Sequence, residues 1–316
     1  MPQDLLQRLN ETNDVLLHYF PLHSALADWG KDLESHLSEW IVTHPDLYQE
    51  ALRQSFEAGC DFASTSTQAA SPWRANVFGF RHKVHEHNVL SARLAKEVAP
   101  PDRYVAGFVS STNPDFLEPV GDLTPGEVRD GYKEQISALL EGGVDVIMVV
   151  GNHIEEAVLA IDVAKGLADI AVISQNVYYA GHTGFRSMMG HTPETGCRML
   201  LDAGADVVGA SCGLMKAEDS TDQRSYYDCA TGLVEEMRAG VPDARLSIQP
   251  NAGMSRLEKG KTVYPATPEE MAAAAPHWVA AGARIVGGCC GTSLEHYRRL
   301  RAVLRSNGSE SEGAAE

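Results

Sequence analysis

Four predicted helices of this chain end in the same way, and this ending constrains the fold more than any other feature. Each helix closes on a glycine, and an apolar run with strand character begins within two residues of it. Glycine readily adopts the left-handed conformation that commonly terminates a helix. The four junctions span residues 57–61, 141–145, 202–206 and 280–284. Their recurrence indicates a chain built from repeated strand–helix units.

Apolar runs and amphipathic stretches alternate along the chain at regular spacing. We predict strands at residues 15–17, 61–64, 104–109, 145–150, 170–174, 206–211, 245–249 and 284–288. We predict helices at residues 47–58, 81–98, 123–141, 154–166, 192–203, 226–239, 267–281 and 293–304. Eight of each indicate an α/β fold, a single (β/α)8 TIM barrel over residues 1–305. The alternative is a doubly wound open sheet, which would also gather the carboxyl ends of its strands.

The composition argues against several classes of partner. The formal net charge is −17, so we expect no binding to nucleic acid or to an anionic membrane. The sequence has no apolar run long enough to predict a membrane span, and its first residues lack the basic start of a secretion signal. Six cysteines in 316 residues do not indicate a disulfide framework, so we expect a reduced, cytoplasmic protein. Residues 306–316 are small, polar and acidic, and we expect them to form a disordered tail.

Three of the cysteines stand at the carboxyl ends of predicted strands. Cys212 follows one strand, and Cys289 and Cys290 follow the last strand, with glycine beside each site. Active sites of (β/α)8 barrels lie at this end of the strands, so we expect the three thiols to meet there. Thiolates suit Zn²⁺, and three protein ligands leave a fourth position open for substrate. We therefore predict a zinc site on these cysteines. The other three are expected to pack in the core, as buried free cysteines commonly do: Cys60, Cys197 and Cys229.

The cysteine motifs resemble those of the homocysteine S-methyltransferase family, zinc-dependent barrels that include betaine–homocysteine methyltransferases and the first module of cobalamin-dependent methionine synthase. Residues 287–292, Gly-Gly-Cys-Cys-Gly-Thr, match the family's last-strand motif. Residues 209–212 match its Gly-x-Asn-Cys motif, with serine in place of asparagine. Residues 250–253, Pro-Asn-Ala-Gly, are similar to the methionine synthase type. The resemblance covers roughly residues 40–305, and it implies methyl transfer to a zinc-bound thiolate, of homocysteine or a related thiol, in one-carbon metabolism.

Two segments depart from the family where the amino group of homocysteine is recognised. The family's first strand ends in Asp-Gly-Ala-Met-Gly-Thr, whereas residues 17–23 here read Leu-His-Tyr-Phe-Pro-Leu-His. Its fourth strand ends in Glu-Thr, whereas residues 149–153 here read Val-Val-Gly-Asn-His. A buried ammonium group needs a carboxylate or a set of acceptors. We therefore expect the metal chemistry to be retained and homocysteine to be a poor acceptor.

We expect the substrate to lie over the carboxyl ends of the strands, as the barrel architecture dictates. The catalytic group is the metal-activated thiolate of the substrate itself, so no catalytic side chain is predicted. The residues predicted to bind the substrate are Tyr19, Thr65, Ser66, Asn152, Asn176 and Asn251.

The methyl donor is left open by the sequence. It is either a small sulfonium or betaine, or a methylated corrinoid carried on a separate protein. Three functions stay open: an S-methyltransferase acting on a thiol, the methyltransferase component of a corrinoid-dependent demethylation system for another methylated small molecule, and a non-catalytic zinc-binding subunit or thiol sensor. The oligomeric state is open as well.

Overall fold

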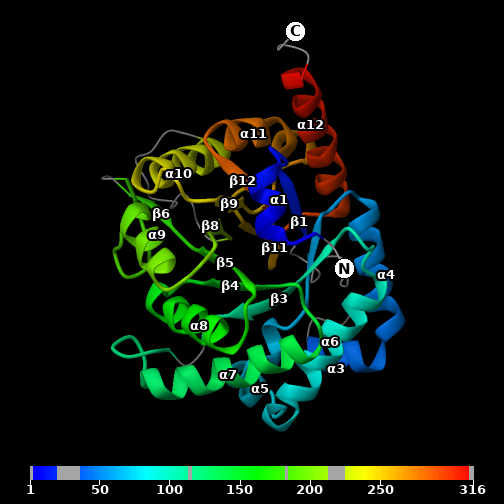
Figure 1. The fold of residues 1–316 in the computed structure, drawn as a ribbon, viewed down its shortest axis with the longest axis vertical. Coiled ribbons are helices and arrows are strands. Elements are labelled where there is room, and N and C mark those ends of the chain that lie inside the picture. The colour runs from blue at the N-terminus through cyan, green and yellow to red at the C-terminus, as the bar shows by residue number, and fades with distance from the viewer. Residues whose placement is uncertain (1–2, 20–35, 113–115, 182–183, 213–224, 313–316) are drawn as a thin grey trace.

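A closed barrel of eight parallel strands forms the centre of the protein (Figure 1), seen in a computed structural model that describes residues 3–19, 36–112, 116–181, 184–212 and 225–312. The strand order is β1-β12-β9-β8-β5-β4-β3-β2, and β1 pairs with both β12 and β2, which closes the barrel. The barrel strands are β1 (Leu16–Tyr19), β2 (Phe62–Ser64), β3 (Tyr104–Ser110), β4 (Val146–Gly151), β5 (Ala171–Asn176), β8 (Val207–Ser211), β9 (Leu246–Gln249) and β12 (Ala283–Gly288). The predicted (β/α)8 TIM barrel is confirmed, and the open-sheet alternative is wrong.

Among the described residues, eight long helices pack around the outside of the barrel, and all eight correspond to predicted helices (Figure 1). They are α4 (Pro45–Glu57), α6 (Val84–Val98), α7 (Pro125–Glu141), α8 (Ile154–Leu167), α9 (Pro193–Asp202), α10 (Tyr226–Gly240), α11 (Pro268–Ala280) and α12 (Leu294–Glu312). Helix α12 extends past residue 305, so residues 306–312 of the predicted tail are helical. Residues 313–316 lie outside the described residues.

Local sequence explains where several of these helices begin. The starts of α7, α9 and α11 each have threonine at the N-cap and proline in the first turn. The hydroxyl groups of Thr124, Thr192 and Thr267 accept hydrogen bonds from backbone N–H groups that the helix itself leaves unpaired. Proline is tolerated at this position because it has no N–H to leave unpaired.

The glycine junctions behave as the sequence predicts. Gly59, Gly143, Gly204 and Gly282 have φ values of 98°, 88°, 105° and 114°, in the left-handed region. Each lies two residues after the end of a helix and just before a barrel strand, so the chain reverses from the outer layer into the barrel within a few residues.

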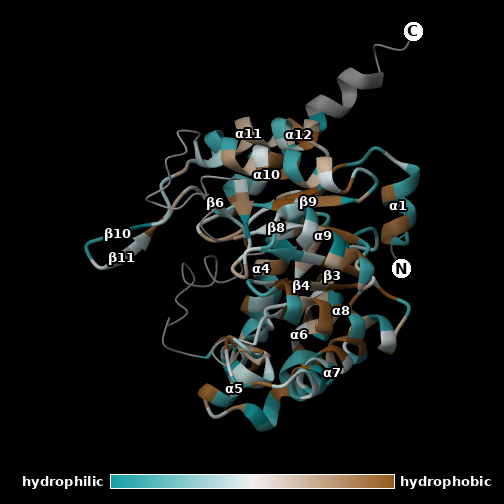
Figure 2. Cartoon of the chain, turned by 90° about the vertical axis from the view of Figure 1, so that its left-hand side faces the viewer, coloured by the Kyte–Doolittle hydropathy of each residue, from teal (hydrophilic) through white to brown (hydrophobic). Residues whose placement is uncertain are grey.

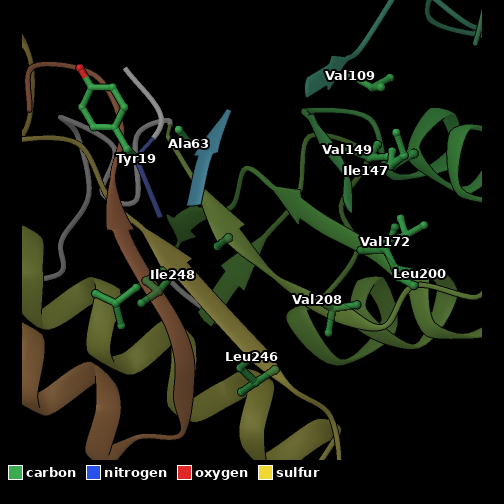
Figure 3. Packing of buried hydrophobic residues seen from close by; sticks show 14 of the residues in the cluster. Tyr19, Ala63, Val109, Ile147, Val149, Val172, Leu200, Val208, Leu246 and Ile248 are labelled. Atoms are coloured by element: carbon green, nitrogen blue, oxygen red, sulfur yellow. The ribbon is translucent and has the colours of Figure 1, made fainter. Parts of the chain in front are cut away.

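Two separate cores stabilise the barrel. The inner core consists of the inward-facing side chains of the strands, such as Phe62 and Met148, and Leu5 and Leu9 of α1 (Leu5–Glu11) pack against it. The outer core lies between the strands and the surrounding helices, and Figure 3 shows Val208 and Ile248 among its residues. The amino-terminal helix therefore closes one end of the barrel, and the carboxyl ends of the strands form the other.

The sequence did not predict the shorter elements. They are α1, α3 (Leu37–Thr43), α5 (Pro72–Val77) and two hairpins, β6–β7 (Tyr179–Gly181 and Gly184–Arg186) and β10–β11 (Arg256–Glu258 and Lys261–Val263). Figure 2 shows the β10–β11 hairpin projecting away from the barrel. No helix among the described residues is long and apolar enough to cross a membrane.

Candidate metal centre

Cys212 directly follows the last residue of β8 and has an unusual backbone conformation. Its φ is 55°, in the left-handed region, which only a small fraction of non-glycine residues adopt. Its backbone N–H donates to the carbonyl oxygen of Gln249 in the neighbouring strand β9, at 3.0 Å. This bond fixes the turn that leaves β8 at the point where the thiol is presented.

Cys289 and Cys290 directly follow β12, and a tight turn holds them at the end of the strand. The backbone N–H and the hydroxyl of Thr292 both donate to the carbonyl oxygen of Cys289, at 3.2 and 2.6 Å. The turn needs Gly291, whose φ is 78° and which leaves no space for a side chain, because a Cβ there would lie 2.2 Å from Cγ of Tyr264.

The three thiols meet at the carboxyl end of the barrel, as predicted. The Sγ atoms of Cys212 and Cys290 are 3.6 Å apart, and those of Cys289 and Cys290 are 3.9 Å apart. Thiolates bound tetrahedrally to zinc at about 2.3 Å would lie about 3.8 Å from one another. The cluster therefore has the spacing of a three-thiolate metal site. Within the described part of the chain it is the one group of three or more His, Cys, Asp or Glu residues close enough to hold an ion.

The end of β9 holds the backbone of all three cysteines. Cys212 donates to the Gln249 carbonyl, Cys289 donates to the Pro250 carbonyl at 2.9 Å, and Cys290 donates to the Asn251 side-chain oxygen at 3.0 Å. Three consecutive residues thus each accept one cysteine N–H. Sequence analysis assigned Asn251 to the substrate, whereas the structure gives its side chain a contact with the metal-site loop.

The thiols of the cluster shift one another's pKa values. Hydrogen bonds with the Cys212 and Cys289 thiols lower the pKa of the Cys290 thiol to about 3. The hydrogen bond with Cys212, together with that to Cys290 and burial, raises the pKa of Cys289 well above its ordinary value. Near neutral pH Cys290 is therefore a thiolate and Cys289 a thiol, and a thiolate is the state that binds a metal.

Two tyrosines border the cluster. The sequence analysis did not assign either of them to the site. The hydroxyl of Tyr226, in the first turn of α10, accepts a hydrogen bond from the Asn251 N–H at 3.1 Å. Tyr264 follows the β10–β11 hairpin and packs on Gly291, and burial and the nearby Cys290 sulfur raise its pKa. The signal available in sequence for Tyr264 is the stretch Lys-Thr-Val-Tyr at residues 261–264, which also resembles the methionine synthase type.

The other predicted substrate residues are distributed over the same end of the barrel. Thr65 accepts a hydrogen bond from the Phe108 N–H at 2.9 Å, and Ser66 is buried beside Tyr48. Tyr19 has its ring against Tyr297 of α12, with centroids 4.9 Å apart, so it belongs to the outer core and faces away from the barrel interior.

Asn152 and Asn176 lie at neighbouring strand ends. Asn152 is half-buried just beyond β4, and Asn176 is the last residue of β5, paired in register with Gly151. Asn176 is fully buried, and neither atom of its side-chain amide has a hydrogen-bond partner. Contact of these residues with a substrate stays a prediction.

A match over almost the whole chain decides the family. The family model described as Homocysteine S-methyltransferase matches residues 6–304. The chain belongs to the homocysteine S-methyltransferase family. The assignment agrees with the resemblance of the cysteine motifs at the ends of β8 and β12.

Known methionine synthases and a solved homocysteine methyltransferase are similar to this chain. It is 28% identical to a methionine synthase of Mycobacterium leprae (strain TN) over 273 residues, and 27% identical to that of Mycobacterium tuberculosis (strain ATCC 25618 / H37Rv). These matches cover 83% of this chain but only 21% and 22% of the relatives, so the chain spans about a fifth of their length. The fold is that of the homocysteine methyltransferase MmuM from Escherichia coli, whose metallated form superposes with a TM-score of 0.73 at 19% identity, covering 94% of this chain and 99% of that one.

Proposed function

We propose that this chain is a zinc-dependent S-methyltransferase that moves a methyl group to a substrate thiolate, and that Cys212, Cys289 and Cys290 would hold the zinc. The observation that carries the proposal is the spacing of the three Sγ atoms, 3.6 and 3.9 Å for the two measured pairs, which suits tetrahedral zinc. Family membership supports the transfer chemistry. The position of the thiols at the carboxyl end of the strands supports a reactive site over a purely structural one.

The residues of the chain would hold the metal and orient its ligands, and the metal would make the substrate thiol more acidic. Zinc held by three thiolates would lower the pKa of a substrate thiol, so that this thiol is a thiolate at neutral pH. Gln249, Pro250 and Asn251 fix the cysteine backbone, so the metal ligands are held before the substrate arrives. The thiolate sulfur then bonds to the methyl carbon while that carbon's bond to the donor breaks, and the electron pair leaves with the donor. Such a displacement depends chiefly on alignment.

The methyl donor is the second substrate of the proposed transfer. We propose a small sulfonium or betaine, or a methylated corrinoid on a separate protein. The second source is supported by the similarity of this chain to methionine synthases over 273 residues. The reverse direction, removal of a methyl group from a methylated small molecule, would use the same residues.

Turnover with a panel of donors and thiols tests the proposal. Zinc-loaded protein would be incubated with a sulfonium, a betaine or methylcobalamin and with simple thiols, and the methyl thioether would be measured by mass spectrometry. We expect thioether formation that disappears on chelation of zinc and in Cys290→Ser. Cys197→Ser, at a buried cysteine outside the cluster, should retain it. Tight zinc binding without transfer in any combination would contradict the proposal and favour a non-catalytic zinc-binding subunit.

A further inference from the structure

At the carboxyl end of the barrel, the side chains that face the interior form an uncharged ring beside the candidate metal site. Successive side chains of a strand point to opposite faces, so every strand contributes one inward-facing residue at this end of the barrel. On β3, β4, β5 and β8 these residues continue the inward-facing positions of the inner core. The ring consists of His18, Ser64, Ser110, Val150, Gln175, Ser211, Gln249 and Gly287.

Hydrogen bonds across the barrel confirm that four polar members of the ring point inward, His18, Ser64, Gln175 and Gln249. The His18 imidazole lies between the Ser64 hydroxyl, at 2.8 Å from Nε2, and the Gln249 amide nitrogen, at 2.7 Å from Nδ1. The Gln175 amide donates to the Ser247 hydroxyl at 3.0 Å. A Cβ on Gly287 would lie 2.5 Å from the Gln249 amide nitrogen, so the glycine provides the space for this side chain.

The ring is neutral even though it contains a histidine. Burial lowers the pKa of His18 to about 4, so the imidazole carries no charge at neutral pH. Because Gln249 donates to Nδ1, the proton of the neutral ring belongs on Nε2, facing Ser64. No Asp, Glu, Lys or Arg occupies any of the eight ring positions.

Four polar atoms of the ring have no hydrogen-bond partner. They are the side-chain oxygens of Gln175, Gln249, Ser110 and Ser211, all buried. Ser211 directly precedes Cys212, and the Gln249 carbonyl accepts from Cys212, so two of the four residues adjoin the metal site. An amide oxygen only accepts hydrogen bonds, and leaving it buried and unpaired costs about 1–3 kcal/mol. A ligand that brings an N–H or O–H group would relieve this cost.

We propose that this ring selects a thiol whose tail is uncharged and donates hydrogen bonds, through a hydroxyl or a carboxamide, over an amino-acid thiol. The inference rests on the proposed function, because the metal site holds the sulfur while the ring meets the tail. The eight ring side chains offer an ammonium group no counter-charge, and burial of an unpaired charge is strongly unfavourable. A neutral donor offers the same hydrogen bonds without that cost.

Calorimetric titration of the zinc-loaded protein with three thiols tests this selectivity. The probes are 4-mercaptobutanamide, homocysteine and butanethiol, which differ in the tail and share the thiol. We expect 4-mercaptobutanamide to bind at least about tenfold more tightly than either of the others, the equivalent of about 1.4 kcal/mol. Homocysteine binding as tightly as the amide, or butanethiol binding as tightly, would overturn the inference while leaving the thiolate site intact. If none of the three binds, the proposed function fails as well.

Restoring a carboxylate to the ring gives a second, independent test. Val150 is the inward-facing residue at the end of β4, and Val150→Glu would place a negative charge in the ring. We expect this variant to bind homocysteine at least about tenfold more tightly than the unaltered protein. Val150→Gln, which has nearly the same shape without the charge, should show no such gain. Equal homocysteine affinity in the two variants, with both folded and loaded with zinc, would contradict the role of ring charge.

Discussion

The side-chain oxygen of Asn251 accepts the backbone N–H of Cys290 at 3.0 Å, which ties one of the three clustered cysteines to the end of the neighbouring strand. Removing this acceptor leaves a partly buried N–H unpaired and frees the Cys290 turn. We expect Asn251→Ala to hold zinc about 5- to 150-fold more weakly, from the loss of about 1–3 kcal/mol. Competition with a chelator would measure this. Asn176→Ala, where the amide makes no hydrogen bond, should hold zinc normally, and equal affinities in the two variants would contradict the role of Asn251.

The buried imidazole of His18 predicts a loss of stability in mild acid. Its pKa is about 4 in the folded protein and 6.5 when exposed, so below pH 6.5 the unfolded chain takes up a proton that the folded chain refuses. Stability should therefore fall by about 2 kcal/mol between pH 7 and pH 5 from this residue alone. Urea unfolding at the two pH values would show a smaller fall in His18→Gln. The same fall in His18→Gln as in the unaltered protein would contradict this assignment, and replacement of the exposed His82 serves as the control.

The glycine between Cys290 and Thr292 predicts a steric effect on the metal site. Gly291→Ala would combine a left-handed φ of 78° with a Cβ only 2.2 Å from Tyr264 Cγ. Gly190→Ala offers a matched control, because Gly190 has a φ of 87° and no atom within 4 Å of its Cβ position. Both variants should lose about 1–2 kcal/mol through the backbone. We expect Gly291→Ala to lose about 1–3 kcal/mol more and to bind zinc more weakly. Equal unfolding free energies would show that Tyr264 moves aside at no cost.

The barrel could be predicted from sequence because its signals are local. Each strand is a short apolar run, and the glycine junctions mark where a helix returns to the barrel. The cysteine cluster could be predicted for a topological reason, since parallel strands bring their carboxyl ends to one face. Cys212 and Cys290 are 78 positions apart, and their Sγ atoms are nonetheless 3.6 Å apart.

The lining of the site could not be predicted because it depends on single-residue register. His18 and Tyr19 are adjacent in β1, and successive side chains of a strand point to opposite faces. The sequence analysis chose Tyr19, whereas His18 faces the interior and Tyr19 packs against Tyr297. The contact between Asn251 and Cys290 is equally invisible in sequence, because 39 positions separate the two residues and an amide side chain fits many roles.

Metal analysis of cysteine variants tests the central claim most directly. Protein produced with zinc present would be measured by elemental analysis as the unaltered chain, as Cys212→Ser, Cys289→Ser and Cys290→Ser, and as the control Cys197→Ser. We predict about one zinc per chain in the unaltered protein and in the control, and loss of most of it in each of the three cluster variants, because each removes one of three thiolate ligands. Absence of zinc from the unaltered protein, or full zinc content in Cys289→Ser, would contradict the assignment.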